Sequence, residues 1–484
     1  MAAGETDGGG GEDEGNTIVG GGDPLSGEFR DGILATGTLT GSSITGTDIT
    51  DTATGVWFQN AQGIDVNNTF VEGSEFFGFR ADGVLTGSKF RDNLITNTSG
   101  IGGGLGHGMY LNNATNLEVY NNIGEDSFGS GLYVTGDTTG TTVTNNLFDG
   151  NRIGITLDNA TNAVIGGLGE DEGNTIIGGG DSLSGEYRDG ILATGTLTGS
   201  SITGTDISDT ATGVWLRDAQ GVDVNNTLVN GSEFFGFRAD GVLTGSKFRD
   251  NDVVNTVGIG GGLGHGMYLN NATNLELHDN LGEDSFGSGL YITGDTSGTT
   301  VRGNLFDDNR VGITLDNATN AVIGGNVVGE DNRIIGGGDA SLDIFRDGIV
   351  AIGISTGSSI TKTTITNTAT GIALRAATGL FITSATVTGS QVWGLNASGE
   401  CVSAVISSTF TLTTGGAGGG AGVLLSGVQS FLIQSATISN NVIGLLATGN
   451  CTATRVIDTT WSGNTTGVIN NSTGAPPLEI DPLP

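Results

Sequence analysis

Residues 108–134 read GMYLNNATNLEVYNNIGEDSFGSGLYV and contain one full period of a repeat that runs along the chain. Gly108 and Gly131 lie 23 residues apart, and each is followed at once by an apolar, an aromatic and a second apolar residue. The same step recurs through a series of glycines that opens at Gly32 and closes at Gly467. A fixed period of this length is typical of a repeat architecture, in which each unit stacks on the next.

The repeat is organised at a second level as well. The first six intervals between the glycines are 23, 23, 30, 23, 23 and 36 residues, which sum to 158, and the second six are the same. We therefore predict three blocks, at 11–168, 169–326 and 327–472. A disordered glycine-rich start is expected at 1–10 and a proline-rich tail at 473–484.

Within each period the residues alternate between apolar and mixed types, which is the pattern of a half-buried strand. Two further apolar clusters follow in most periods, separated by Gly, Asn, Asp, Ser and Thr turns. The sequence thus predicts an all-β solenoid of about 18 coils, each with about three short strands and a shared core. Asparagine pairs such as Asn121–Asn122 and Asn145–Asn146 recur near the second turn, where stacked amides can bond along the axis.

Three strings carry a likeness to a known family: LDNATNAVIGG at 157–167, GNTIIGG at 173–179 and GHGMYLNNATNLE at 106–118. With them the chain resembles the right-handed parallel β-helix repeat proteins, the superfamily that includes pectate lyases and many bacterial surface proteins. The resemblance implies a right-handed parallel β-helix and an extracellular or cell-surface location. It does not select an activity, because the same coils serve lyases, hydrolases, epimerases, adhesins and inert stalks.

Composition restricts the partners. The chain has 52 acidic against 17 basic residues, a net charge of −35, so nucleic acid and anionic membranes are not expected partners. No apolar run is long enough to insert into a bilayer, and we expect no secretory signal in the first residues. Residues 11–22 repeat almost letter for letter at 169–180. We therefore expect more repeats in a longer parent chain, or end-to-end self-association.

The second residue after each glycine points outward, so these side chains should form a row across the coils. We define the aromatic stripe as this row with the next outward position and the histidine before the glycine. Its first set is Trp57, Arg80, Asp82, His107, Tyr110, Asn112 and Tyr133, and its second set is Trp215, Arg238, Asp240, His265, Tyr268, Asn270 and Tyr291. Flat rings between planar polar groups suit a sugar chain, so the predicted partner is a polysaccharide. The alternative is that Tyr and Trp simply cover a strand surface.

Catalysis is the rival interpretation of the stripe. The GHG triplets at 106–108 and 264–266 resemble that of polygalacturonases, but the NTD, DD and RIK motifs of that family are not at corresponding positions. Glycosidic hydrolysis needs two carboxylates across one bond, and only Asp82 and Asp31 lie beside the first set. We predict a non-catalytic structural or adhesive protein, with a polysaccharide lyase or glycoside hydrolase as the alternative. Ice binding through threonine ladders is a third interpretation, disfavoured because threonines cluster in the first coil of each block and are not expected to repeat coil after coil.

Acidic clusters suggest one possible cofactor, calcium, which takes carboxylate and carbonyl oxygens from flexible loops. The candidate ligands are Glu12, Asp13, Glu170, Asp171, Glu330 and Asp331. No EF-hand or glycine-rich nonapeptide spacing accompanies them, so a solvated acidic loop is the alternative. No other cofactor is expected.

The two cysteines, Cys401 and Cys451, each lie seven residues after a repeat glycine. They therefore occupy one coil position two levels apart, roughly 9–10 Å between Cα atoms. That separation is beyond the reach of a disulfide, so both thiols should be free.

Overall fold

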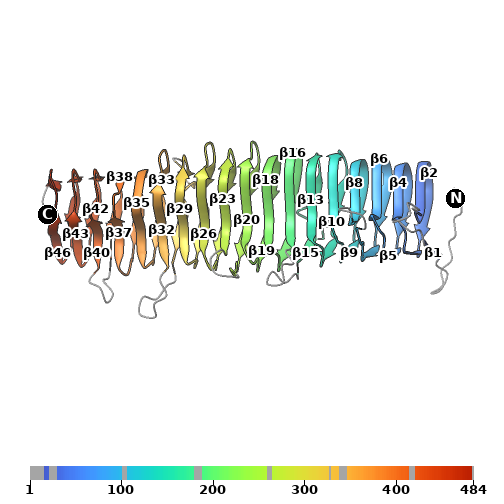
Figure 1. Cartoon of the computed structure of the whole chain (residues 1–484), viewed down its shortest axis with the longest axis horizontal. Coiled ribbons are helices and arrows are strands. Elements are labelled where there is room, and N and C mark those ends of the chain that lie inside the picture. The colour runs from blue at the N-terminus through green and yellow to red at the C-terminus, as the bar shows by residue number, and fades with distance from the viewer. Residues whose placement is uncertain are drawn as a thin grey trace. The chain divides into compact units, whose positions relative to one another are not determined.

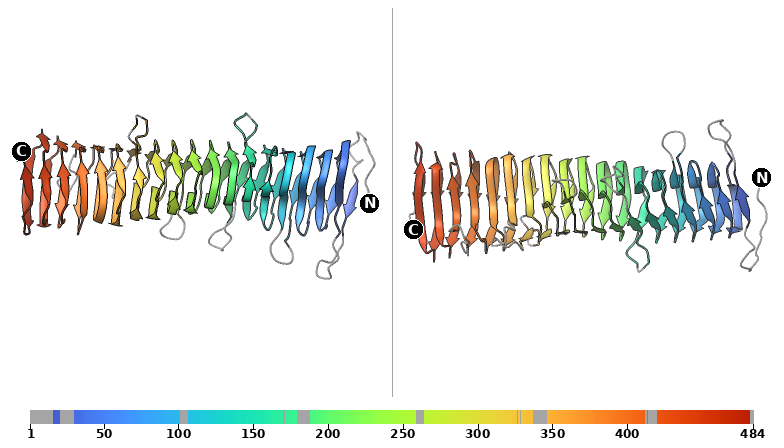
Figure 2. Two further views of the ribbon diagram at one scale, coloured as in Figure 1. Left: turned by 90° about the horizontal axis from the view of Figure 1, so that it is seen from above. Right: turned by 60° about the horizontal axis from the view of Figure 1, so that its bottom comes forward.

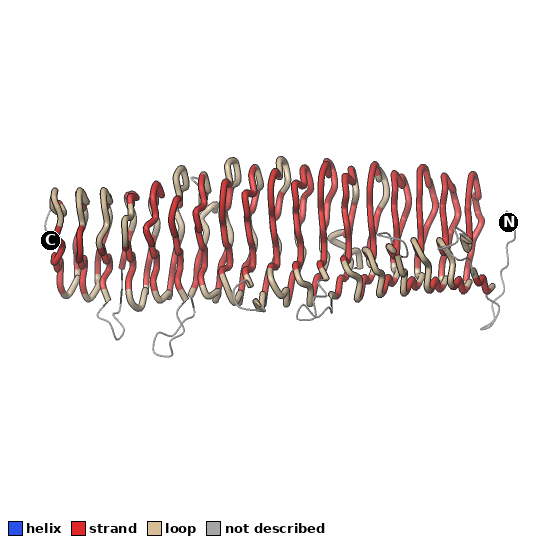
Figure 3. The backbone as a smooth tube through the Cα atoms, in the orientation of Figure 1, coloured by secondary structure: helices blue, strands red, loops and turns tan. Residues whose placement is uncertain are grey.

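The computed structural model describes residues 16–20, 30–100, 106–169, 171–178, 188–258, 264–325, 327, 329–336, 346–411, 413 and 420–481. The chain divides into two compact units. Unit 1 comprises Met1–Glu233 with Gly245–Lys247, and unit 2 comprises Phe234–Thr244 with Phe248–Pro484. No helix occurs among the described residues of either unit (Figure 3). The predicted all-β solenoid fold is confirmed, because each unit is a stack of parallel strands.

Unit 1 contains two parallel ladders that share one core (Figure 1). The long-strand sheet is made of β2 (Ile33–Thr45), β4 (Thr54–Asn67), β6 (Phe77–Arg91), β8 (His107–Tyr120), β10 (Ser130–Asp137), β11 (Thr142–Thr144), β13 (Ile153–Thr161), β14 (Val164–Gly166), β16 (Asp189–Thr203) and β18 (Thr212–Asn225). The short-strand sheet is made of β1 (Thr17–Val19), β3 (Asp48–Thr50), β5 (Phe70–Glu72), β7 (Leu94–Thr96), β9 (Ile123–Glu125), β12 (Leu147–Asp149), β15 (Thr175–Ile177), β17 (Asp206–Ser208) and β19 (Leu228–Asn230).

Unit 2 has the same two ladders (Figure 2). Its long-strand sheet is made of β20 (Phe235–Val242), β23 (His265–Thr273), β24 (Glu276–His278), β26 (Ser288–Asp295), β27 (Thr300–Arg302), β29 (Val311–Thr319), β30 (Val322–Ile323), β32 (Asp347–Ile354), β33 (Ser359–Thr361), β35 (Thr370–Thr383), β37 (Trp393–Ser398), β38 (Val402–Ile406), β40 (Ala421–Ser426), β41 (Leu432–Gln434), β43 (Ile443–Asn450), β44 (Arg455–Ile457), β46 (Thr466–Thr473) and β47 (Glu479–Asp481). Its short-strand sheet is made of β22 (Asp252–Val254), β25 (Leu281–Glu283), β28 (Leu305–Asp307), β31 (Arg333–Ile335), β34 (Thr364–Thr366), β36 (Thr386–Thr388), β39 (Thr409–Thr411), β42 (Thr437–Ser439) and β45 (Thr460–Ser462). The remaining strand, β21 (Lys247–Arg249), contains the boundary between the units.

The recurring glycine is required by the close approach of successive coils. A Cβ atom placed on Gly108 would lie 2.8 Å from the carbonyl oxygen of Gly131 and 2.9 Å from Ser127 Oγ. The same clash with the next coil would occur at Gly78, whose added Cβ would lie 2.8 Å from the Gly108 oxygen. The flanking apolar residues, among them Met109, are fully buried. The glycine period therefore marks the line along which the coils come closest together.

Buried asparagines form a second line of contacts, in unit 1. The side-chain nitrogen of Asn93 donates to Asn122, that of Asn122 donates to Asn146, and that of Asn146 donates to Asn174, each over 3.0 Å. Each acceptor oxygen also takes the backbone N–H of the preceding asparagine. The predicted stacking of amides is confirmed at Asn122 and Asn146. Because these residues are buried, every polar atom must find a partner in the protein, and the amide nitrogens of Asn93 and Asn122 also donate to the backbone oxygens of Val66 and Phe90.

Replacing Asn122 by Ala should weaken unit 1 locally by about 1–3 kcal/mol, because it removes the acceptor of the buried Asn93 backbone N–H and one of the two donors to the Asn146 oxygen. Native-state hydrogen exchange of the amides in β7 and β9 would measure the loss. Asn121→Gly is the matched control, because Asn121 is an exposed neighbour with a left-handed φ of 58° that glycine adopts freely. Equal protection in both variants would contradict a stabilising role for the ladder.

Both cysteines of unit 2 are free and fully buried, so the prediction that they form no disulfide is confirmed. The Cys401 thiol lies 3.0 Å from the carbonyl oxygen of Ser398, and burial raises its pKa. A buried thiol with a raised pKa is a poor nucleophile. Because both thiols are fully buried, both are expected to be unreactive in the folded protein.

Thiol titration should find two free cysteines in unreduced, denatured protein and very slow reaction in the native state. The slow step would be the opening of the coils around Cys401 and Cys451, so mild denaturant should accelerate labelling. Rapid native labelling would show that the coils around these residues open readily.

Candidate functional site

The first set of the aromatic stripe lies on the long-strand sheet of unit 1, in the register that the period predicted. Trp57 on β4 aligns with Arg80 on β6, Arg80 aligns with Tyr110 on β8, and Tyr110 aligns with Tyr133 on β10. All four side chains are half-buried, whereas the residues on either side of each point into the core. One outward row of large planar groups thus crosses four successive coils.

Asp82 organises the polar groups of this row. Its carboxylate accepts hydrogen bonds from Trp57 Nε1 at 2.7 Å, from Arg80 Nε at 2.6 Å and from Asn112 Nδ2 at 3.0 Å. The Arg80 guanidinium lies 4.4 Å from the centre of the Trp57 ring, within the range of a cation–π contact. The donors and rings are therefore fixed in place without a ligand.

The aromatic rings continue the row on the far side of Arg80. Tyr110 lies 4.7 Å from Phe77 and 5.5 Å from Tyr133, between ring centres. The Tyr133 hydroxyl donates to Asp158 at 2.6 Å, and burial together with this carboxylate raises the pKa of Tyr133. Asp158 occupies the next outward position of the stripe, as the alternation predicted. Phe77 was not predicted as a site residue, although the period marks it, because Phe77 precedes its glycine just as His107 does.

The histidines of the stripe lie behind its exposed face. His107 is 7% exposed, and its Nδ1 accepts the backbone N–H of Ser130 at 3.0 Å. His265 in unit 2 has the same exposure and accepts from Ser288. Burial lowers the pKa of each to about 4. The rings of His107 and Tyr133 lie 4.6 Å apart. The histidines therefore lie against the tyrosines, and their direct contact with a ligand stays a prediction.

The second set repeats this geometry within unit 2, except for Trp215. Arg238 Nε donates to Asp240 at 2.6 Å, and Asn270 Nδ2 donates to the same carboxylate at 3.0 Å. The rings of Tyr268 and Tyr291 lie 5.6 Å apart. Trp215 belongs to unit 1, where it aligns with Leu192 and lies 5.3 Å from the Arg217 guanidinium.

The corresponding row of block three has no aromatic residue. Ala373, Asn396, Leu424 and Leu446 align in that order on β35, β37, β40 and β43. Ala373 is only 3% exposed. This part of unit 2 therefore offers an internal comparison that shares the backbone of the stripe and lacks its chemistry.

The predicted calcium ligands are only partly described. Glu12, Asp13 and Glu170 lie outside the described residues. Glu330 accepts from Arg302 Nη1 at 2.9 Å and from the Val327 backbone N–H at 3.1 Å, while Asp171 is exposed. Within the described ranges no three acidic, histidine or cysteine side chains cluster as metal ligands would. The calcium site stays a prediction.

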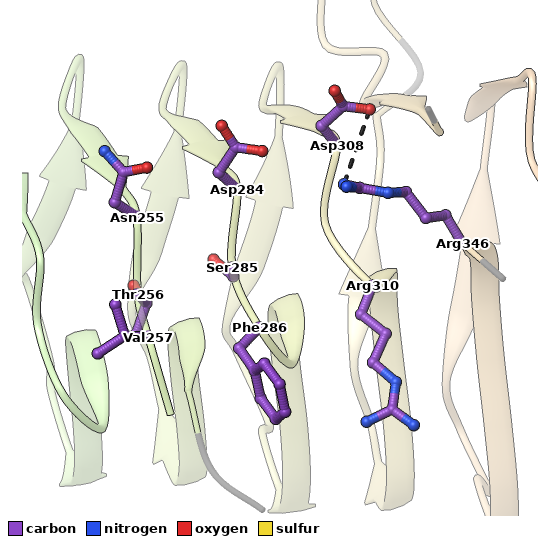
Figure 4. Close-up of a pocket in the computed structure, with 9 residues that line it drawn as sticks. All are labelled: Asn255, Thr256, Val257, Asp284, Ser285, Phe286, Asp308, Arg310 and Arg346. Atoms are coloured by element: carbon purple, nitrogen blue, oxygen red, sulfur yellow. Dashed lines mark ion pairs between the residues drawn. The ribbon is translucent and has the colours of Figure 1, made fainter. Parts of the chain in front are cut away.

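A hollow of about 620 Å³ lies elsewhere in unit 2, where the short strands turn toward the next long strands (Figure 4). Its lining includes Asn255, Asp284, Phe286, Asp308, Arg310 and Arg346. Phe286 is 52% exposed, and the Arg310 guanidinium lies 6.0 Å from its ring centre. Arg346 and Asp308 approach to 3.7 Å. The sequence analysis missed this hollow, although EDSFGSG at 125–131 and 283–289 places an exposed phenylalanine in both blocks.

Comparison with known families points to the same fold as the parallel strand pairing. The family described as the right handed beta helix region matches residues 31–167 and 189–349, more than half of the chain. The chain belongs to this right-handed β-helix family. The resemblance seen in the sequence is thereby confirmed, and the family establishes the handedness of the coils. No curated protein matches the chain, and no described helix is long and apolar enough to cross a membrane.

Solved structures with a similar backbone path are distant in sequence. The Dettilon tailspike protein is 13% identical, with a TM-score of 0.36 over 72% of this chain and 66% of its own. A mannuronic acid-specific family 6 polysaccharide lyase from human gut microbiota is 11% identical, with a TM-score of 0.35 over 89% of this chain and 87% of its own. The tailspike of E. coli bacteriophage HK620, solved with a hexasaccharide, is 10% identical, with a TM-score of 0.33 over 76% and 69%. No conclusion about activity rests on likenesses this weak.

The buried histidines make stability depend on pH in a defined direction. The pKa of His107 is about 4 when folded and near 6.5 when unfolded, so protons bind preferentially to the unfolded chain. The free energy of unfolding should therefore be unaffected by His107 above pH 6.5. It should fall as the pH drops toward 4, by up to about 3 kcal/mol for this residue. Denaturant unfolding between pH 6.5 and 5, where most carboxylates stay ionised, would measure the slope.

His107→Gln should reduce this slope even though it lowers stability at pH 7. The imidazole resonances of His107 should show no protonation above pH 5. A titration midpoint near 6.5 for His107 in the folded protein would contradict its burial as a neutral ring.

Proposed function

We propose that this protein is a non-catalytic extracellular structural or adhesive protein that binds polysaccharide along its aromatic stripe. The observation that supports this most directly is the in-register row of Trp57, Arg80, Tyr110 and Tyr133, half-exposed on one sheet. Each ring presents an apolar face next to a planar polar group, which is the combination that a sugar ring with its hydroxyls requires.

Preorganisation strengthens the proposal. Asp82 holds Trp57, Arg80 and Asn112 before any ligand arrives, so little side-chain freedom is lost when a sugar binds. The tyrosine rings of both sets are likewise stacked on their neighbours. Two similar sets on one chain also give a long polymer two places to bind, so modest contacts can reinforce one another.

The carboxylates beside the first set favour binding over catalysis. Asp82 accepts three side-chain donors, and Asp158 accepts from Tyr133, Asn159 and Thr194. A glycoside hydrolase needs one carboxyl group that can protonate the leaving oxygen and a second that can act as base or nucleophile. Oxygens that are already fixed by cationic and amide donors are poorly suited to either role. A polysaccharide lyase or hydrolase remains the alternative that a turnover assay must test.

Replacing Trp57 and Trp215 together by Ala should weaken glycan binding at least tenfold, because both tryptophan stacking surfaces are lost. A glycan array would identify the ligand, and calorimetry would then measure the affinity of the wild type and the variant. Phe381→Ala is the matched control, because Phe381 is 53% exposed on the block-three strand β35, away from the stripe. Circular dichroism should be unchanged in both variants.

Three results would contradict the proposal. Full binding by the double variant would show that the stripe is not the binding surface. Release of reducing ends or unsaturated sugars by the wild type would establish an enzyme instead. An array that finds no glycan ligand would leave a plain structural protein.

A further inference from the structure

Unit 2 has a second regular surface, on its short-strand sheet. The last five short strands, β34, β36, β39, β42 and β45, read TIT, TVT, TFT, TIS and TWS. We define the threonine face as their ten outward residues. One row is Thr364, Thr386, Thr409, Thr437 and Thr460, and the other is Thr366, Thr388, Thr411, Ser439 and Ser462.

The threonine face is regular in both directions. Each of the four strand pairs is parallel and in register over all three residues, without a shift. Hydroxyl groups therefore recur about every 4.8 Å across the strands and roughly every 6.6 Å along each strand. The middle residues Ile365, Val387, Phe410 and Ile438 are buried, which fixes the outward direction of the others. Nine of the ten outward residues are half-buried or exposed, and Ser439 is 8% exposed.

This face is also free of charge in a strongly acidic protein. The preceding short strands of unit 2 place Asp252, Glu283, Asp307 and Arg333 at the same outward positions. Arg333 aligns directly with Thr364, so the change in chemistry occurs between two adjacent coils. Strand propensity alone does not account for it, because other short strands of the chain use leucine and phenylalanine outward.

We propose that the threonine face binds ice, with ordered lattice water as its ligand. The two spacings of the hydroxyls are close to repeat distances of water molecules in the ice lattice. A hydroxyl can donate and accept as a lattice water does, while the neighbouring methyl group sits between lattice positions without competing for hydrogen bonds. The β-branched side chain has few rotamers, so the array is ordered before contact.

The absence of charge is what favours ice over other ligands. A carboxylate or ammonium group orients its own hydration shell and would disrupt a planar lattice of water. A polysaccharide is the less suitable occupant, because the ten outward positions include no aromatic ring for a sugar to stack on. A second copy of the same face could also pack against it. Measuring the oligomeric state of the variants distinguishes such an interface from ice binding.

The test uses the full chain and measures inhibition of ice recrystallisation and thermal hysteresis. The wild type should inhibit recrystallisation, and Thr386→Lys with Thr409→Lys should abolish the effect, because two long cations would interrupt the array at its centre. Thr175→Lys is the matched control. Thr175 is an exposed outward residue of β15 in unit 1 whose row neighbours are Leu147 and Asp206, so it lies in no threonine row.

Circular dichroism and thermal unfolding check that each variant is folded. A second double variant, Thr386→Val with Thr409→Val, keeps the shape of the side chains while removing their hydroxyls. This variant should lose most of the inhibition if the hydroxyls match the lattice. A wild type without activity, or a double lysine variant with full activity, would overturn the proposal. A double lysine variant that changes oligomeric state while ice inhibition stays the same would identify an interface between copies instead. The variant that lacks Trp57 and Trp215 should inhibit ice growth as the wild type does. Glycan binding by the aromatic stripe and ice binding by the threonine face can therefore be refuted separately.

Discussion

The close approach of each repeat glycine to the carbonyl oxygen of the next coil is the constraint on which the rest of the structure depends. At Gly108 an added Cβ would lie within 3 Å of both the Gly131 oxygen and Ser127 Oγ, a distance that no real side chain tolerates. With glycine there, the strands pair in parallel at their normal separation and the apolar residues on either side interlock. A single bulky residue on this line would separate two coils and expose the core between them.

Parallel pairing in register has a consequence for function as well as for stability. Any outward position is repeated one coil further on, so surface chemistry is arranged in rows rather than in isolated sites. Trp57, Arg80 and Tyr110 form one such row because their strands align residue by residue. The same rule produces the threonine face, where one row contains only threonine and the other contains threonine and serine. Both of the proposed ligands, a polysaccharide and ice, have a repeating structure that suits surfaces arranged in rows.

Much of the fold and the outward direction of the stripe residues could be predicted because alternation about the glycine fixes which side chains point outward. This alternation correctly placed Trp57 and Tyr110, whereas the stacked asparagines were predicted from their recurrence near the second turn. It could not place His107, because the residue before the glycine is the first of its strand, where the exposure of the side chain depends on the neighbouring coil. The hollow around Phe286 combines turns of several coils, and no local pattern describes it. The threonine rows were missed because the short strands begin 22, 23, 28 and 23 residues apart, so a fixed period does not align them.

The distribution of charge separates the two surfaces of unit 2. On the long-strand sheet, Arg238 and Asp240 neutralise each other at 2.6 Å, so that the stripe presents polar groups whose charges are already paired. On the short-strand sheet, charge is excluded from β34 onward rather than paired. The stripe residues lie on β20, β23 and β26, and the threonine face begins several coils later on a different side of the core. Because no strand is shared, a substitution in one surface leaves the register of the other intact. A solenoid can therefore carry surfaces of unrelated chemistry at the cost of only a few outward residues per coil, since the inward residues and the glycine line already maintain the backbone.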